Sequence, residues 1–151
     1  MNIELARNNM IEQQIRPWQV SDARVLQLLA VVKREGFVPA PHKGLAFAEL
    51  EIPLAGGQCM LEPRIEARLL QDLAVLPHET VLEIGAGSGF MAALLARSAQ
   101  RVVSLEINPE LASMARTNLR NAGIQNAEVR EADGSKTASA EGTYDAILLS
   151  G

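Results

Sequence analysis

The sequence contains little cysteine and few aromatic residues. Cys59 is the single cysteine among 151 residues, and aromatic side chains make up 3% of the chain. One cysteine allows neither a disulfide framework within the chain nor a thiolate metal cluster, so we expect no metal and a reducing, cytoplasmic location. The scarcity of aromatic residues argues against a stacking surface for single-stranded nucleic acid.

Long apolar runs and an excess of positive charge are also missing. No run approaches the roughly 20 apolar residues that a membrane-spanning helix needs, and the N-terminal residues MNIELARNNM lack the pattern of a signal peptide. The chain has 14 Lys and Arg against 18 Asp and Glu, mixed along its length, for a net charge of −4. Without a basic stripe, binding to nucleic-acid phosphates is not expected. These features predict a soluble protein with no nucleic-acid or membrane partner.

The first half of the chain, residues 1–76, reads as a cap of helices and loops. Apolar residues at helical spacing predict a first helix over Asn2–Arg16, and Ser21 is the expected N-cap of a second. Residues 37–61 show no periodicity and contain several prolines and glycines, which predicts an ordered loop region with short extended pieces. Pro63 fits the first turn of a third helix.

The second half, residues 77–151, alternates strands with helices. Strands are expected at Thr80–Ile84, Arg101–Ile107, Asn126–Arg130 and Tyr144–Leu149. Strands separated by helices at this pitch indicate βαβ units and a parallel sheet, and their uninterrupted apolar character indicates helices on both faces. We therefore predict one α/β domain, a doubly wound Rossmann-like core with the cap at its N-terminal side.

A glycine-rich turn follows the first of these strands. Gly85, Gly87 and Gly89 form a GxGxG pattern. The dinucleotide fingerprint GxGxxG would need glycine where Phe90 stands, so a nicotinamide-dependent dehydrogenase is disfavoured and the spacing is typical of methyltransferases. By itself the turn is also compatible with a tight strand-to-helix connection that binds nothing.

Two acidic residues follow the next two strands. Glu106 comes about 20 residues after the first glycine, where such folds bind ribose hydroxyls, although a solvated charge at a strand end is the simpler alternative. Asp133 and Gly134 come after the third strand, where a carboxylate can meet an adenine amino group. Since all three features fall at the carboxyl ends of parallel strands, together they favour a nucleoside-containing ligand.

Several motifs in the same order resemble one family. KREGFVPA at 33–40, IPLAGGQ at 52–58, VLEIGAGSGF at 81–90 and YDAILLSG at 144–151 are similar to the protein-L-isoaspartate (D-aspartate) O-methyltransferases. The glycine motif alone indicates only the methyltransferase superfamily. The first two segments are more specific, and the resemblance covers essentially the whole chain.

The resemblance implies S-adenosyl-L-methionine as cofactor and the isoaspartyl carboxylate of a damaged protein as methyl acceptor, hence a role in protein repair. It implies a loop over the cofactor formed by Gln58, Cys59, Met60 and Leu61, with Trp18 and Pro39 in the cap that shapes the substrate cleft. The cofactor-binding residues that it implies are Glu83, Gly85, Gly87 and Gly89 for the methionine part, Glu106 and Ile107 for the ribose, and Asp133 and Gly134 for the adenine.

The loop departs from the family pattern. The family usually has GQTIS, whereas Cys59 and Leu61 stand here at the two hydroxyl positions. A carboxylate acceptor with a pKa of about 4 is ionised at neutral pH and needs no general base, so the departure removes orienting hydrogen bonds and we assign no catalytic residue. The alternative is a cofactor-binding methyltransferase-like domain with another acceptor or without isoaspartyl activity.

The sequence ends directly after the fourth expected strand. Family members continue with further strands and helices, and the apolar run Ala146–Leu149 is typical of a strand with a neighbour on each side. We therefore expect that this 151-residue species is a fragment of a longer protein or that it self-associates through the exposed edge at 144–149.

Overall fold

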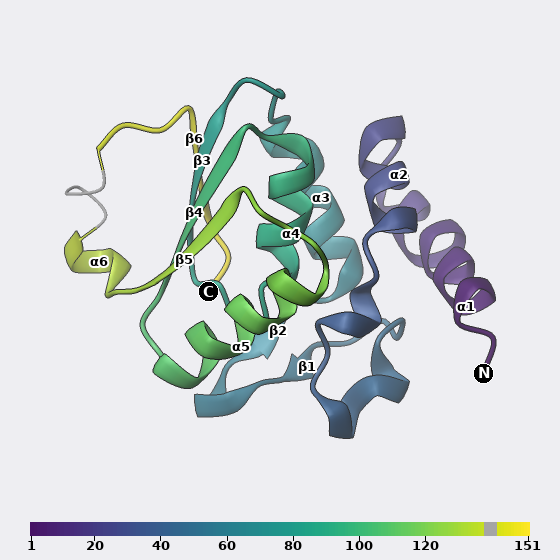
Figure 1. Ribbon diagram of the computed structural model, residues 1–151. Coiled ribbons are helices and arrows are strands. Elements are labelled where there is room, and N and C mark those ends of the chain that lie inside the picture. Colours follow the sequence, from purple (N-terminus) through teal and green to yellow (C-terminus); the bar gives the residue numbers. More distant parts are fainter. Residues whose placement is uncertain (138–141) are drawn as a thin grey trace.

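The computed structural model describes residues 1–137 and 142–151 and contains a four-stranded parallel sheet (Figure 1). The strand order is β5-β4-β3-β6. The chain thus adds two strands on one side of β3 and then crosses to the other side, which creates a topological switch point beside β3. The strands are β3 (Thr80–Ile84), β4 (Arg101–Glu106), β5 (Ala127–Glu131) and β6 (Ala146–Leu149).

Helices cover the two faces of the sheet unequally. Together α3 (Pro63–Leu73), α4 (Phe90–Ser98) and α5 (Pro109–Asn121) form the layer against one face, and α4 is buried along most of its length. Within the described ranges, the other face carries the single short helix α6 (Gly134–Thr137) (Figure 1). The Rossmann-like α/β fold is confirmed, but the expectation of full helical cover on both faces is met on one face only.

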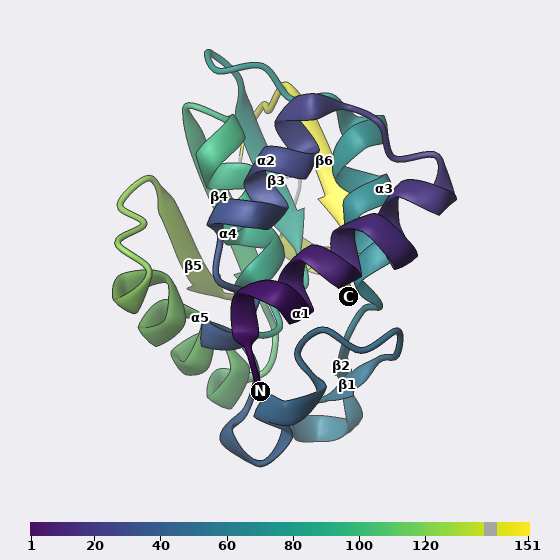
Figure 2. The same cartoon turned by 90° about the vertical axis from the view of Figure 1, so that its right-hand side faces the viewer.

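The N-terminal helices pack outside α3 and α4. The first is α1 (Ile3–Met10), which continues as a π turn over Ile11–Ile15 and a 3₁₀ turn over Arg16–Trp18, and α2 (Ala23–Val31) follows (Figure 2). The prediction that Ser21 is the N-cap of this second helix was wrong, because Asp22 is the N-cap. The carboxylate of Asp22 accepts the N–H of Arg24, while the N–H groups of Ser21 and Asp22 both donate to the side chain of Gln71 on α3.

The loop region between α2 and α3 lies under the carboxyl ends of the sheet. It contains 3₁₀ turns at Arg34–Gly36, Ala40–Leu45 and Ala55–Gly57 and the two-residue strands β1 (Ile52–Pro53) and β2 (Cys59–Met60), which pair antiparallel. In Figure 2 the arrowheads of the long strands point toward β1 and β2. The predicted short extended pieces are therefore present, at the edge of the sheet where α/β proteins bind ligands.

Candidate cofactor site

The glycine turn joins β3 to α4 through backbone conformations that favour glycine. Gly85, Gly87 and Gly89 have φ values of +95°, +54° and +89°, a region that costs other L-residues roughly 1–2 kcal/mol. A Cβ on Gly89 would lie 3.2 Å from the Cα of Ala115 on α5. The turn is thus left-handed at three positions, and its last glycine also lets α4 and α5 pack closely.

Glu106 links this turn to the end of the neighbouring strand. Its side chain is buried, and its two carboxylate oxygens accept the N–H of Gly87 at 2.9 Å and the N–H of Asn108 at 3.0 Å. Each oxygen has two lone pairs and can accept a further hydrogen bond. Ile107 next to it is 65% exposed. The predicted ribose acceptor is therefore held rigidly, with an apolar side chain at its side.

A cavity of about 260 Å³ opens at this edge of the sheet. It brings together seven of the predicted cofactor-binding residues, which come from the loop, from the glycine turn after β3 and from the ends of β4 and β5. These residues are Cys59, Gly85, Gly87, Glu106, Ile107, Asp133 and Gly134. The cavity therefore lies at the carboxyl ends of the strands beside the switch point, as the Rossmann-like topology leads one to expect.

A smaller cavity of about 30 Å³, called the inner cavity below, lies between the loop and the glycine turn, and the larger one is called the outer cavity. Cys59, Gly85, Gly87 and Ser150 line both cavities, so the two are contiguous. Three predicted residues line the inner cavity but not the outer one: Met60, Leu61 and Glu83. Leu54, Glu66 and Phe90 also line the inner cavity. Gly89 lines neither cavity and serves as the N-cap of α4.

Glu83 is a fully buried acid in the wall of the inner cavity. Its two oxygens accept the hydroxyls of Ser104 and Ser150, each at 2.6 Å. Burial raises the pKa of Glu83 to about 7, although both hydrogen bonds lower it. Sequence reasoning missed the two serines. A hydroxyl in the otherwise apolar strand β4 was the available signal, because a buried hydroxyl needs a partner.

Asp133 and Gly134 form the far wall of the outer cavity. The Asp133 carboxylate accepts both the N–H and the hydroxyl of Ser135, and the hydroxyl bond contributes most to lowering the pKa of this aspartate. A Cβ on Gly134 would lie 2.5 Å from the Ile84 side chain, so this position excludes larger residues. The carboxylate is ionised and oriented at neutral pH.

The loop faces the glycine turn without any hydroxyl between Gln58 and Leu61. The N–H of Leu54 donates to the carbonyl of Gln58, and a Cβ on Gly87 would be 3.4 Å from the Leu54 side chain. Burial, followed by the carboxylate of Glu51, raises the pKa of the half-buried Cys59 thiol. Cys59 is therefore a thiol, not a thiolate, at neutral pH and is a poor nucleophile.

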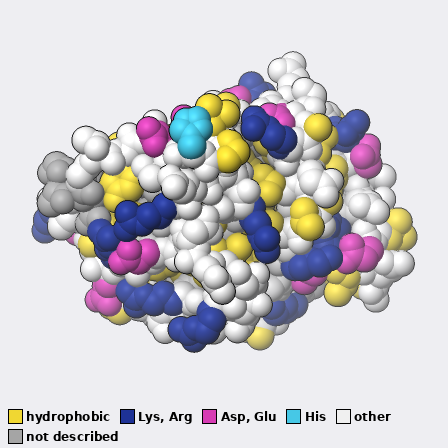
Figure 3. Space-filling view, turned by 45° about the horizontal axis from the view of Figure 1, so that its top comes forward, with side chains coloured by type: hydrophobic (Ala, Val, Ile, Leu, Met, Phe, Trp, Pro, Cys, Tyr) yellow, Lys and Arg dark blue, Asp and Glu magenta, His cyan; other side chains and the backbone are white. Residues whose placement is uncertain are grey.

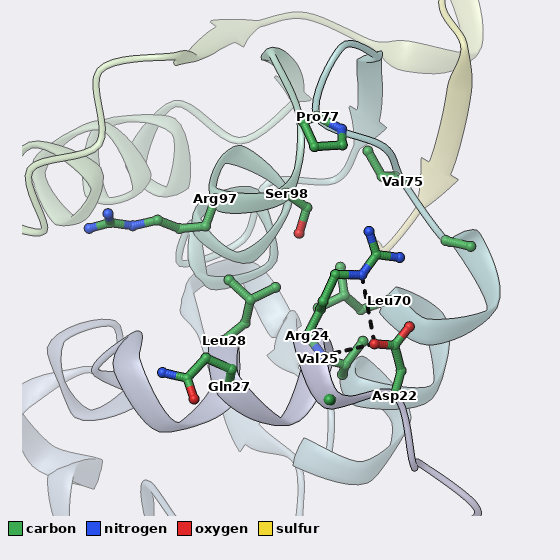
Figure 4. A pocket seen from close by; sticks show the side chains of 12 residues that line it. Asp22, Arg24, Val25, Gln27, Leu28, Leu70, Val75, Pro77, Arg97 and Ser98 are labelled. Carbon is green, nitrogen blue, oxygen red and sulfur yellow. Dashed lines mark hydrogen bonds and ion pairs between the residues drawn. The ribbon is translucent and has the colours of Figure 1, made fainter.

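An apolar pocket of about 470 Å³ lies elsewhere. Figure 4 shows this pocket between α2, α3 and α4, with Pro77, just before β3, at its side. At the start of α2, Arg24 pairs with Asp22 beside the pocket. This position is at the amino ends of the strands, the wrong end of the sheet for ligand binding in this fold. The surface on that side mixes both charge signs (Figure 3).

Two further classes of site find no support in the described part of the chain. Residues 1–137 and 142–151 contain no group of three or more His, Cys, Asp or Glu side chains that could hold a metal ion. Among the same residues, every helix is too short or too polar to cross a bilayer.

Comparisons with known proteins identify the family. The profile of the protein-L-isoaspartate (D-aspartate) O-methyltransferases matches residues 5–151. A protein-L-isoaspartate O-methyltransferase of Methanoculleus marisnigri is 41% identical over 143 residues, covering 95% of this chain and 65% of that protein. One of Syntrophobacter fumaroxidans is 40% identical over 149 residues, covering 99% and 70%. This chain thus spans about two thirds of the length of these relatives.

Solved structures with a similar fold include two protein-L-isoaspartate O-methyltransferases. A Plasmodium falciparum protein-L-isoaspartate O-methyltransferase in complex with S-adenosyl-L-homocysteine superposes with a TM-score of 0.79 at 16% identity, covering 99% of this chain and 73% of that one. Another protein-L-isoaspartate O-methyltransferase gives 0.79 at 23% identity, covering 95% and 47%. With the family profile and the 40% identities, the conclusion is that this chain belongs to the protein-L-isoaspartate (D-aspartate) O-methyltransferase family.

Proposed function

We propose that this chain binds S-adenosyl-L-methionine and supports methyl transfer to the L-isoaspartyl carboxylate of damaged proteins. One observation carries the proposal: the glycine turn, Glu106 and Asp133 line one cavity, and the loop Gln58–Leu61 borders it. Family membership and the S-adenosyl-L-homocysteine bound to the Plasmodium relative support it.

The chemistry of the residues present suits each part of the cofactor. The positive φ values at Gly85 and Gly87 and the missing Cβ at Gly87 leave room for the methionine part beside the turn. Glu83 would lie beside that part, where a cationic sulfonium favours the ionised form of its carboxyl group. Glu106 would hold the ribose with Ile107 beside it, and Asp133 the adenine amino group with Gly134 beside it. When bound, the cofactor supplies an electrophilic methyl group.

The protein would contribute position, not proton transfer. An ionised carboxylate acceptor needs no base, so the rate depends on holding it in line with the methyl group and on excluding water. Cys59, Met60 and Leu61 border the inner cavity, where their apolar side chains would exclude water. Since none of these three side chains offers a hydroxyl, we expect backbone N–H groups of the loop to orient the acceptor.

One observation favours a second candidate, methyl transfer to a different acceptor. Cys59 and Leu61 replace the family's hydroxyls, and the inner cavity is lined by the two carboxyl groups of Glu66 and Glu83. No cationic side chain lines the inner cavity, so an anionic acceptor would form no charge-assisted hydrogen bond with a side chain there. A neutral acceptor does not need such a bond.

Radiolabelled methyl transfer to an isoaspartyl peptide, beside its aspartyl twin, separates the two candidates. We expect labelling of the isoaspartyl peptide only. Binding of S-adenosyl-L-homocysteine without labelling of that peptide would favour the second candidate, and absence of binding would overturn both.

We further propose a cytoplasmic location with damaged proteins as partners.

We also propose self-association of this 151-residue chain. Within the described residues β6 pairs with β3 alone, and Ile147 and Leu149 are 57% and 69% exposed. Exposed apolar edge strands promote pairing between copies. Light scattering at rising concentration should show growing mass that Ile147→Lys reduces. A strictly monomeric parent chain would contradict this.

A further inference from the structure

Arg34, in the 3₁₀ turn after α2, is one of the most deeply buried side chains of the protein, at 1% exposure. Its guanidinium donates in three directions: Nε to the carbonyl of Ala46 at 2.8 Å, Nη1 to the carboxylate of Glu66 at 2.5 Å, and Nη2 to the carbonyl of Leu61 at 2.9 Å. It also lies over the ring of Phe90, 4.9 Å from its centroid. One side chain thus joins four separate segments.

Three of these contacts converge behind the inner cavity. Leu61 is the last residue of the loop, and Glu66 lies on α3. Phe90 is the first residue of α4, directly after the glycine turn. All three line the inner cavity. The guanidinium therefore sets the separation between the end of the loop and the start of α4, which are the two walls that enclose the site of transfer.

We propose that Arg34 is a positioning residue that holds the loop Gln58–Leu61 over the glycine turn, so that an acceptor bound by the loop meets the methyl group. The inference rests on the proposed function. Because Arg34 binds the backbone carbonyl of Leu61, the position of the loop end does not depend on which side chain stands at residue 61. A lysine cannot replace this arrangement, because a single ammonium does not provide the planar fork of guanidinium donors.

The chain contains a matched control in Arg7 on α1. Arg7 is also 1% exposed, donates to the carboxylate of Glu35 at 2.6 Å, and lies 5.2 Å from the ring centroid of Phe47. It lines neither cavity of the site. Both arginines are thus buried, paired with a carboxylate and close to an aromatic ring, although Glu35 is 24% exposed and Glu66 only 6%. Only Arg34 reaches the loop.

Arg34→Lys and Arg7→Lys should be compared in stability, S-adenosyl-L-homocysteine binding, methylation kinetics and amide hydrogen exchange. We expect both variants to lose stability, Arg34→Lys more than Arg7→Lys, because Arg34 donates three hydrogen bonds and Arg7 donates one. Arg34→Lys alone should speed exchange across 58–61 and lower kcat by about tenfold, with a smaller effect on cofactor Kd. Glu66→Gln keeps an acceptor for Nη1 and should reproduce the effect weakly, which provides a folded variant if Arg34→Lys does not fold.

Equal rates of amide exchange at residues 58–61 in Arg34→Lys and Arg7→Lys would overturn the inference. If Arg34→Lys does not fold, an exchange rate of these residues in Glu66→Gln equal to that of the parent chain would also overturn it. Exchange is measured with and without S-adenosyl-L-homocysteine, so the result does not depend on turnover. A parent chain that fails to bind this ligand or to methylate the isoaspartyl peptide refutes the proposed function, while the loop measurement still decides the role of Arg34.

Discussion

The two sides of the candidate site are held in different ways. The strand side is part of the sheet ladder: Gly85 N–H donates to the Leu105 carbonyl at 2.8 Å, and Ala132 N–H donates to the Glu106 carbonyl at 2.9 Å. The loop side consists of two-residue strands, and a side chain, that of Arg34, ties its last residue, Leu61, to the core.

This difference indicates which part of the site can change in sequence within the family. The strand side is held by backbone hydrogen bonds, so its position does not depend on particular side chains, and it carries the glycines and acids that the family pattern leads one to expect. The loop depends on individual side chains, and it is there that Cys59 and Leu61 depart from the family pattern. The predictions below alter first the strand side and then the loop.

The largest effect is expected at the last glycine of the turn. Gly89→Ala places a Cβ 3.2 Å from the α5 backbone at a φ of +89° and should cost roughly 2–5 kcal/mol of unfolding free energy. Gly123→Ala is the control, since that glycine has a φ of +72° with nothing within 4 Å; it should cost about 1–2 kcal/mol. Chemical denaturation measures both, and equal costs would mean that the helix contact is unimportant.

Glu83 should make stability depend on pH. Its pKa is about 7 in the folded protein against an ordinary value of 4.5, so folding takes up a proton. Its contribution is therefore most favourable below about pH 4.5 and is lost as pH rises to about 7, a change of up to about 3 kcal/mol.

Glu83→Gln should flatten the decline of unfolding free energy between pH 4.5 and 7. The Ser150 hydroxyl lies 3.1 Å from the carbonyl of Gly85 and can donate there instead, so the variant should fold. Glu131→Gln, at an exposed acid, should keep the parental slope. An unchanged slope in Glu83→Gln would place the titrating group elsewhere.

Glu106→Ala tests the cofactor side more gently. It removes the acceptors for the N–H groups of Gly87 and Asn108 and for the ribose hydroxyls. Affinity for S-adenosyl-L-methionine should fall by about 1.5–3 kcal/mol, or roughly ten- to a hundredfold in Kd by calorimetry. Glu131→Ala, at the end of the adjacent strand, should leave Kd unchanged. Unaltered binding in Glu106→Ala would remove this residue from the site.

The smallest effect is expected on the loop. Leu61→Ser restores a hydroxyl where the family has one and should raise isoaspartyl methylation several-fold, for a gain of about 1 kcal/mol. Leu61→Ala is the control, because it shortens the side chain without adding a donor. A rate in Leu61→Ser no higher than in Leu61→Ala, with cofactor binding intact, counts against an isoaspartyl acceptor.

Much of the fold could be predicted from local sequence. The strand Thr80–Ile84 was predicted at its observed bounds, the other three to within one or two residues, and Pro63 begins its helix as expected. These features depend on short-range causes: apolar runs, the missing N–H of proline and the conformational freedom of glycine. Parallel strands then bring Glu106 and Asp133 to one edge without further information, because their carboxyl ends must lie together.

Only the tertiary structure decided how these groups are held. Nothing local indicates that Ser104 and Ser150 pair with Glu83, that the N–H of Gly87 donates to Glu106, or that Arg34 contacts the loop carbonyl some 27 residues away. Each depends on which buried polar group finds a partner across elements. A sequence states which groups must be satisfied, whereas the partner is set by packing between segments that are distant along the chain.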